Sequence, residues 1–188
     1  MPSPKDTQYS STIDWARGNR QDKTTVESLQ QLTTLLRSGK YTGTLGTLLK
    51  IFYLGHSLGS YLANALISTT LALSDAAILT GMAYGENSGP SPEAFGLRIA
   101  TELAAGRWNG RDNGYLTWVD AFANATTFCC PNSYDKEVLW YTEDVKQPLA
   151  AIELLTIGVL RLNASNFARP VMVSSDLQLL KEKDTHCH

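Results

Sequence analysis

Net charge, cysteine and uninterrupted apolar segments are all scarce in this chain of 188 residues. Its 16 basic and 18 acidic side chains nearly cancel, and a net charge of −2 provides no basic surface for nucleic acid, so we expect no such partner. Three cysteines cannot form a closed set of disulfides, and Cys129-Cys130 with His186 and His188 lacks the spacing of a zinc site. We therefore expect neither a metal nor a cofactor.

A transmembrane segment is not expected either. A membrane-spanning helix needs about 20 mostly apolar residues, and the most apolar stretch, residues 61–84, is interrupted by polar side chains such as Asn64 and Asp75. The first residues, MPSPKDTQYSS, lack the apolar core of a secretory signal. The sequence does not fix the cellular compartment. We expect a cytoplasmic protein by default, and a secreted one if a leader is missing from the N-terminus.

What the chain does contain is the composition of a globular domain, with 43% hydrophobic and 18% charged residues. Its length suits one domain, residues 1–188, because no linker or internal repeat divides it. The oligomeric state is not indicated by any pattern in the sequence.

The pattern of residues 24–81 predicts an alternation of helices and strands. Thr24 and Glu27 have capping-box spacing and open a helix that ends at Ser38-Gly39. Its apolar stripe consists of Val26, Leu29, Leu32, Leu35 and Leu36. The apolar run 48–54 predicts a buried strand, the next helix extends to Ser74-Asp75, and residues 76–80 predict a second strand. Such an alternation favours a parallel sheet with crossover helices.

The segment Gly55-His56-Ser57-Leu58-Gly59 between the first strand and the second helix has the pattern of a nucleophile elbow. A sharp strand-to-helix turn lifts a serine clear of the sheet, and the crowding of that turn favours glycine on both sides. The same turn places the Leu58 N–H at a helix N-terminus, where it can stabilise an oxyanion. Ser57 is therefore the predicted nucleophile.

The second half of the chain predicts more helix than strand. Helices are expected over 93–105, 133–141 and 148–162, and a short strand over 170–173. The aromatic side chains between them, over 108–128, fit two interpretations equally: the lining of an acyl or aromatic pocket, or an ordinary core.

The run Ile51–Ser60, followed by the segments ANALIS and Asp75–Gly81, resembles the α/β-hydrolase superfamily, and most of all the fungal proteins of the alpha/beta hydrolase-1 type. Ile13–Asn19 is similar to the segment that follows an earlier strand of the family, and Phe167–Val173 resembles the strand that precedes its catalytic acid. The resemblance covers about 13–176 and implies an α/β-hydrolase-like three-layer sandwich, with a partial parallel sheet and a helical cap insertion over about 86–165. Relative to the family the chain is truncated at both ends.

The resemblance also implies the remaining site residues. Asp176, after the last strand, matches the catalytic acid, with Glu86 as the alternative position. His186 is the candidate base, since the family's order is serine, acid, histidine. His56 precedes the nucleophile, so its side chain is expected to leave on the opposite side and either to support a neighbouring site residue or to pack. The family's His-Gly oxyanion loop has no counterpart here.

Two functions follow from these residues. The first is a serine hydrolase, carboxylesterase- or lipase-like, that cleaves an ester or similar bond of a small apolar substrate through Ser57. The second is a truncated, catalytically inactive hydrolase-fold protein, or one that binds a small molecule or partner, because the second oxyanion donor is missing and the base is weakly defined. The substrate's identity is not indicated by the sequence.

Overall fold

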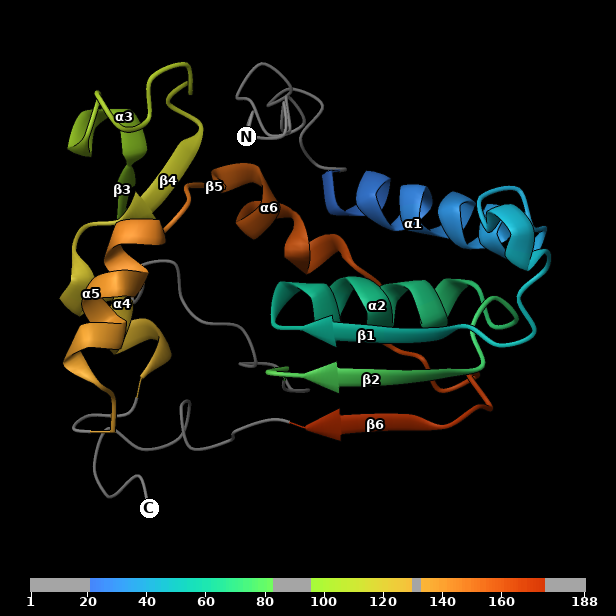
Figure 1. Ribbon diagram of the computed structural model, residues 1–188. Coiled ribbons are helices and arrows are strands. Elements are labelled where there is room, and N and C mark those ends of the chain that lie inside the picture. The colour runs from blue at the N-terminus through green and yellow to red at the C-terminus, as the bar shows by residue number, and fades with distance from the viewer. Residues whose placement is uncertain (1–20, 83–95, 130–132, 175–188) are drawn as a thin grey trace. The chain divides into compact units, whose positions relative to one another are not determined.

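The computed structural model describes residues 21–82, 96–129 and 133–174 (Figure 1). The chain divides into two compact units. The parallel-sheet unit holds residues 21–82 and 156–174, and the inserted unit holds residues 96–129 and 133–155. The protein is thus a mixed α/β chain with helices and small sheets.

The parallel-sheet unit contains three strands, β1 (Phe52–His56), β2 (Ala76–Thr80) and β6 (Val171–Ser174), in the order β1-β2-β6. Both pairings are parallel. α1 (Gln21–Arg37) precedes the sheet, and α2 (Leu58–Thr69) connects β1 to β2. The structure therefore confirms the alternation of helices and strands in the first half of the chain and the parallel sheet that it predicted.

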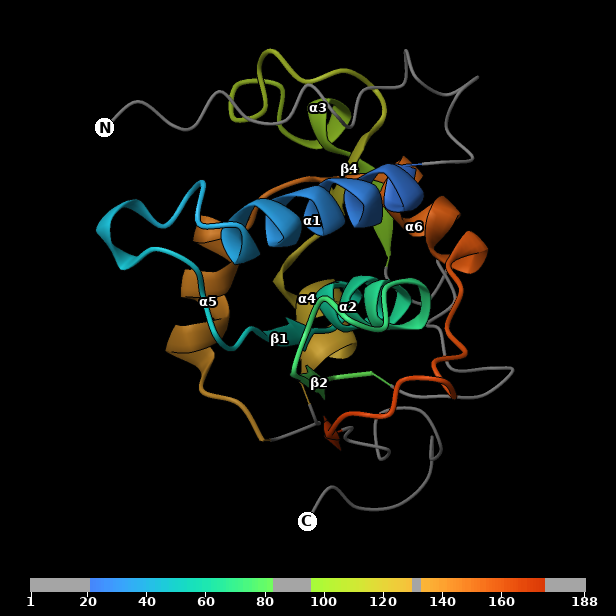
Figure 2. The same cartoon turned by 90° about the vertical axis from the view of Figure 1, so that its right-hand side faces the viewer.

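One face of this sheet is covered by α2, and α1 packs in turn against α2 (Figures 1 and 2). Ala77 and Leu79 of β2 point to the covered face and are almost completely buried. Their buried apolar neighbours are Tyr61, Ala63, Ile67, Met82 and Phe167. Ala65 and Leu66 of α2 meet Val26 of α1 in a second apolar cluster. Burial on two sides explains why α2 is apolar around most of its circumference.

Buried polar side chains of α2 hold the segment that leads into β6. The Asn64 amide, fully buried, donates to the Leu162 carbonyl over 2.7 Å, and the Ser68 hydroxyl donates to the Arg161 carbonyl over 2.7 Å. A 3₁₀ turn, η5 (Ile157–Val159), begins this segment. These bonds satisfy backbone carbonyls that have no strand partner, so the segment is fixed without regular secondary structure.

The other face of the sheet carries exposed apolar side chains. Phe52 and Leu54 of β1 are 63% and 75% exposed, and Met172 of β6 is 54% exposed. Within the described residues β1 pairs with β2 alone, so it forms an edge of the sheet. Parallel sheets in stable domains have both faces covered, and unpaired edges are prone to association.

Several element boundaries differ from the sequence-based expectation. β1 begins at Phe52 rather than Leu48, and Leu49, which was predicted to be buried, is 86% exposed. A short 3₁₀ turn, η3 (Gly43–Leu45), lies in the preceding loop. An apolar run does not distinguish a strand from its flank, because the first strand residue is set by pairing with β2.

The inserted unit contains an antiparallel sheet that the sequence did not predict. Its strands β3 (Leu97–Ile99), β4 (Tyr115–Trp118) and β5 (Leu149–Ala150) pair in the order β3-β4-β5. The helix expected over 93–105 is wrong from Leu97 to Ile99, and among the described residues of that range α3 (Ala100–Leu103) is the helical part. Strands of two to four residues leave too short a pattern to be recognised.

The other helices of this unit were placed approximately. α5 (Lys136–Val145) extends beyond the helix expected over 133–141, and α4 (Ala121–Phe128) was not separately predicted. The long helix expected over 148–162 is wrong, because β5 occupies its first turn and α6 (Ala151–Thr156) is short. β6 follows the strand expected over 170–173 closely.

Arg107 holds the C-terminal end of α5. Its guanidinium donates to the carbonyls of Glu143 and Lys146, at 3.1 and 3.0 Å, and also to that of Asp144. The same group lies 4.5 Å from the centre of the Trp108 ring. The last carbonyls of a helix lack partners within the helix, so this cation satisfies them and also complements the negative end of the helix dipole.

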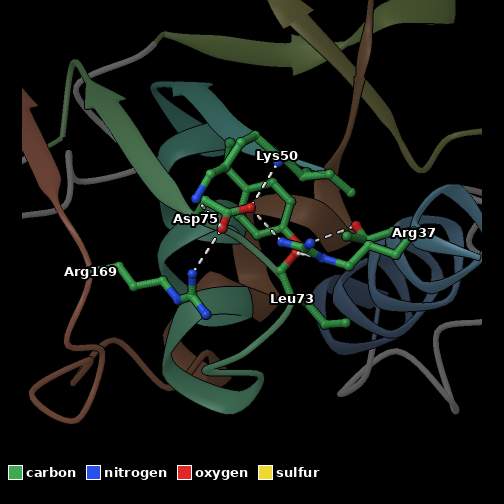
Figure 3. A network of polar contacts seen from close by, with 8 residues as sticks. Arg37, Lys50, Leu73, Asp75 and Arg169 are labelled. Carbon is green, nitrogen blue, oxygen red and sulfur yellow. Dashed lines mark hydrogen bonds and ion pairs between the residues drawn. The ribbon is translucent and has the colours of Figure 1, made fainter. Parts of the chain in front are cut away.

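Asp75 joins the beginnings of the strands in the parallel-sheet unit (Figure 3). Its carboxylate, 9% exposed, accepts hydrogen bonds from Arg37 at the end of α1, over 2.6 Å, and from the Ile51 N–H before β1, over 2.9 Å. Arg169, ahead of β6, contributes a contact at 2.9 Å, and Lys50 one at 3.4 Å. These hydrogen bonds and cations hold the pKa of Asp75 far below its ordinary value.

Replacing this carboxylate should destabilise the protein in a pH-dependent way. Because the folded-state pKa of Asp75 is lowered, its stabilising contribution is present above the pKa of an unfolded aspartate, about 4, and is lost as the pH falls below that value. We expect Asp75→Asn to melt at a lower temperature than the wild type at pH 7, with the difference shrinking in melts below pH 4. Asp144→Asn, which changes an exposed carboxylate, is the control.

The exposed face and edge of the sheet should promote self-association. We expect Leu54→Lys to reduce concentration-dependent light scattering, because a charge on an edge strand discourages pairing, while the melting temperature changes little. Leu71→Lys, a change outside the sheet, serves as the control. A wild-type protein that stays monomeric at all concentrations and melts sharply and reversibly would contradict this prediction.

Candidate active site

Ser57 occupies the turn between β1 and α2 in a conformation that side chains rarely adopt. Its φ is 50° and its ψ is −122°, and it is the one residue other than glycine with a positive φ in the described part of the chain. Such a conformation costs of order 1–3 kcal/mol and persists only where the surrounding structure enforces it. The strained strand-to-helix turn that the sequence predicted is therefore present.

Hydrogen bonds to the last residue of β2 hold this turn. The Ser57 N–H donates to the Thr80 carbonyl over 2.9 Å. The hydroxyl of Ser60, fully buried, donates to the same carbonyl over 2.7 Å and accepts from the Thr80 N–H over 3.0 Å. Ser60 therefore bridges the first turn of α2 to the end of β2. No local sequence pattern indicates this role of Ser60, because its bond joins residues 20 positions apart.

The two glycines of the motif are not equivalent. A Cβ added to Gly55 would lie 2.5 Å from the Gly59 carbonyl oxygen and 2.6 Å from the Cα of Ser60. A Cβ added to Gly59 would meet nothing within 4 Å. The expectation that crowding requires glycine on both sides of the serine is therefore wrong for Gly59. The backbone of Gly59 lies close to Gly55, so it is Gly55, in β1, that has no room for a side chain.

The Leu58 N–H is placed as an oxyanion donor would need to be. Leu58 is the first residue of α2, so its N–H has no acceptor within the helix. The positive end of the helix dipole lies at the same turn, and Ser57 is exposed there. A developing negative charge beside Ser57 would therefore meet a backbone donor at a helix N-terminus.

His56 is held by β2. Its Nδ1 lies 2.9 Å from the Thr80 hydroxyl oxygen, and that hydroxyl donates to the Gly55 carbonyl over 3.0 Å, so it accepts from Nδ1. Gly81, with a φ of +60°, leaves room for the ring, since a Cβ there would be 2.9 Å from the histidine Cε1. His56 is exposed, so its position is set by this hydrogen bond rather than by packing in a core.

The partners of Ser57 in a catalytic triad are not fixed by the described residues. Asp176, Glu86 and His186 all lie outside them. Within residues 21–82, 96–129 and 133–174, no side chain forms a hydrogen bond with the Ser57 hydroxyl. The same residues contain no cluster of three potential metal ligands. The carbonyl of Ser174, the last residue of β6, accepts a hydrogen bond from the Gly81 N–H over 2.9 Å. β6 therefore ends at the carboxyl-terminal end of the sheet, where Ser57 also lies.

The aromatic stretch 108–128 contributes to a core and also lines a cavity. Trp108 and Tyr115 are buried and form a small core with Ala100. Trp118 and Phe128 line an apolar cavity within the inserted unit. The core interpretation therefore holds for the first two residues, and an acyl or aromatic pocket stays a prediction.

Comparison with known protein families, curated proteins and solved structures gives no match to this chain. Over the described residues, none of the helices combines the length and apolar character needed to cross a membrane.

Substituting each glycine of the turn separately should reveal the asymmetry. We expect Gly55→Ala to lower the free energy of unfolding by about 3 kcal/mol, because its Cβ collides with backbone atoms that have no room to move. Gly59→Ala should be neutral or raise stability by about 0.5–1 kcal/mol, because it reduces the entropy of the unfolded chain. Urea denaturation of the two variants and the wild type measures both effects, and equal losses in both would contradict the geometry.

Proposed function

We propose that this protein is a serine hydrolase of the α/β-hydrolase type, acting on an ester or similar carbon–heteroatom bond of a small apolar molecule. The observation that carries the proposal is the strained backbone of Ser57 at a strand-to-helix turn. Strain of this kind is retained where it presents a side chain for chemistry, and a serine in such a turn is the nucleophile of this enzyme class.

The chemistry would begin with attack of the Ser57 hydroxyl oxygen on the carbonyl carbon of the substrate. The serine proton would pass to a histidine, for which His186 is the candidate, oriented by Asp176 or by Glu86. The oxyanion of the tetrahedral intermediate would be bound by the Leu58 N–H. Return of the proton to the leaving alcohol would give an acyl-serine, which water would then hydrolyse.

The surrounding fold supports this assignment. A parallel sheet with α2 on one face, and with the serine just beyond the carboxyl end of β1, is the setting in which α/β proteins place their ligands. The full three-layer sandwich with a cap belongs to the proposal, and the uncovered face with Phe52 and Leu54 is where a further helical layer would pack.

A second candidate function is a hydrolase-fold protein that does not catalyse and that binds a small molecule or partner instead. It is favoured by the hydroxyl of Ser57, which has no hydrogen-bonded base in the described part of the chain, and by His56, whose Nδ1 is engaged by Thr80. Without a base, any residual rate acceleration would come from substrate binding and the Leu58 N–H.

A fluorophosphonate probe tests the nucleophile directly. We expect folded wild-type protein to be labelled at Ser57, and Ser57→Ala to remain unlabelled, because phosphonylation requires an activated serine oxygen. Ser38→Ala, which removes an exposed serine at the end of α1, should label as the wild type does. Folded wild-type protein without label at Ser57 would rule out the hydrolase proposal.

Ester turnover separates the two candidate functions. With a p-nitrophenyl ester of a short acid, a working hydrolase should lose several orders of magnitude in kcat/KM on Ser57→Ala. Equal rates for the wild type and Ser57→Ala would leave the non-catalytic protein as the correct description.

A further inference from the structure

The inserted unit holds an open apolar cavity of about 350 Å³ whose lining residues all belong to that unit. Its walls come from α4, α5 and the end of β4. The rings of Trp118 and Phe128 lie against each other with centroids 5.2 Å apart and planes at 57°, and Leu139 adds a buried aliphatic surface. A cavity of this size and lining has the dimensions of a small-molecule site.

One polar side chain of this cavity forms no hydrogen bond with the described residues. Asn124 of α4 is 4% exposed and lines the cavity, and across the described residues its carboxamide forms no hydrogen bond. A carboxamide has two N–H donors and one acceptor oxygen, and those of Asn124 are not among the side-chain atoms shut off from solvent without a partner. A ligand that supplies both an acceptor and a donor would pair with them.

The Lys146 ammonium is a second polar group in the cavity, and one of its N–H bonds is not used among the described residues. The Lys146 side chain, 8% exposed, donates to the Trp118 carbonyl over 2.7 Å and pairs with Glu143 over 2.6 Å. An ammonium group has three N–H bonds, and the third has no acceptor in the part of the chain that the structure describes. Glu143 neutralises the charge of Lys146, and Asp135 also lines the cavity, so an anionic ligand would not be favoured.

We propose that this cavity binds a small, uncharged aromatic carboxamide. The ring would lie among Trp118, Phe128 and Leu139, and the amide group would exchange hydrogen bonds with the carboxamide of Asn124. The carbonyl oxygen of the ligand would also be an acceptor for the remaining N–H of Lys146. The site is independent of Ser57 and does not rest on the proposed hydrolase activity.

Three naphthalene compounds of similar size test the chemistry. In calorimetric titrations we expect 2-naphthamide to bind at least tenfold more tightly than 2-naphthoate, which carries a negative charge, and than 2-methylnaphthalene, which lacks polar atoms. Cys129 lines the cavity and reports on its occupancy, so 2-naphthamide should slow alkylation of this thiol. Equal affinities for the three compounds, or alkylation of Cys129 unaffected by 2-naphthamide, would overturn the proposal.

Variants distinguish a ligand-binding role of Asn124 from a structural one. Asn124→Leu should abolish the tenfold preference for the amide, because it removes the carboxamide that pairs with the ligand. Asn166→Leu, on an exposed residue, should bind 2-naphthamide as the wild type does. An Asn124→Leu protein that keeps the preference would refute the assignment.

A second variant keeps the test decisive if Asn124→Leu does not fold. Val138 lines the cavity but is 60% exposed, so Val138→Trp should obstruct the cavity with little cost to stability. We expect it to weaken 2-naphthamide binding at least tenfold, and unchanged binding would place the ligand elsewhere and overturn the proposal.

Discussion

The parallel-sheet unit depends on the carboxylate of Asp75. It receives a backbone N–H from the residue before β1 and guanidinium groups from the end of α1 and from the segment before β6. Strands that are aligned at their first residues are aligned at their last, because the parallel register advances one pair at a time. Fixing Phe52 opposite Ala76 therefore also sets His56 opposite Thr80, where the Ser57 turn begins.

The strained turn at Ser57 is consequently held in place by the strands of the parallel sheet. The Thr80 carbonyl continues the strand ladder by accepting from Ser57, and the Ser60 hydroxyl binds the main chain of Thr80 on both its donor and its acceptor. These bonds, together with the packing of α2 against β2, compensate the unfavourable backbone of Ser57. The conformation is thus sustained by residues that have no chemical part in the proposed reaction.

Local patterns were sufficient to predict the elements whose signal is complete within a few residues. The Ala76–Thr80 strand was placed correctly because glycine and aspartate bound it, and Ser57 was located because the turn has a sequence signature. The roles of Asp75 and Ser60 were not predicted, since each depends on partners more than 15 residues away. The short strands of the inserted unit were missed for a related reason: their existence is decided by pairing rather than by composition.

The difference between Gly55 and Gly59 has a consequence for how such turns are recognised. The backbone contact prohibits a side chain only at the position before the serine, while the position after it lies on an open part of the helix surface. Evolution would therefore be free to replace the second glycine with alanine or serine and leave the turn intact. A pattern search that demands both glycines would reject proteins whose backbone is the same as this one.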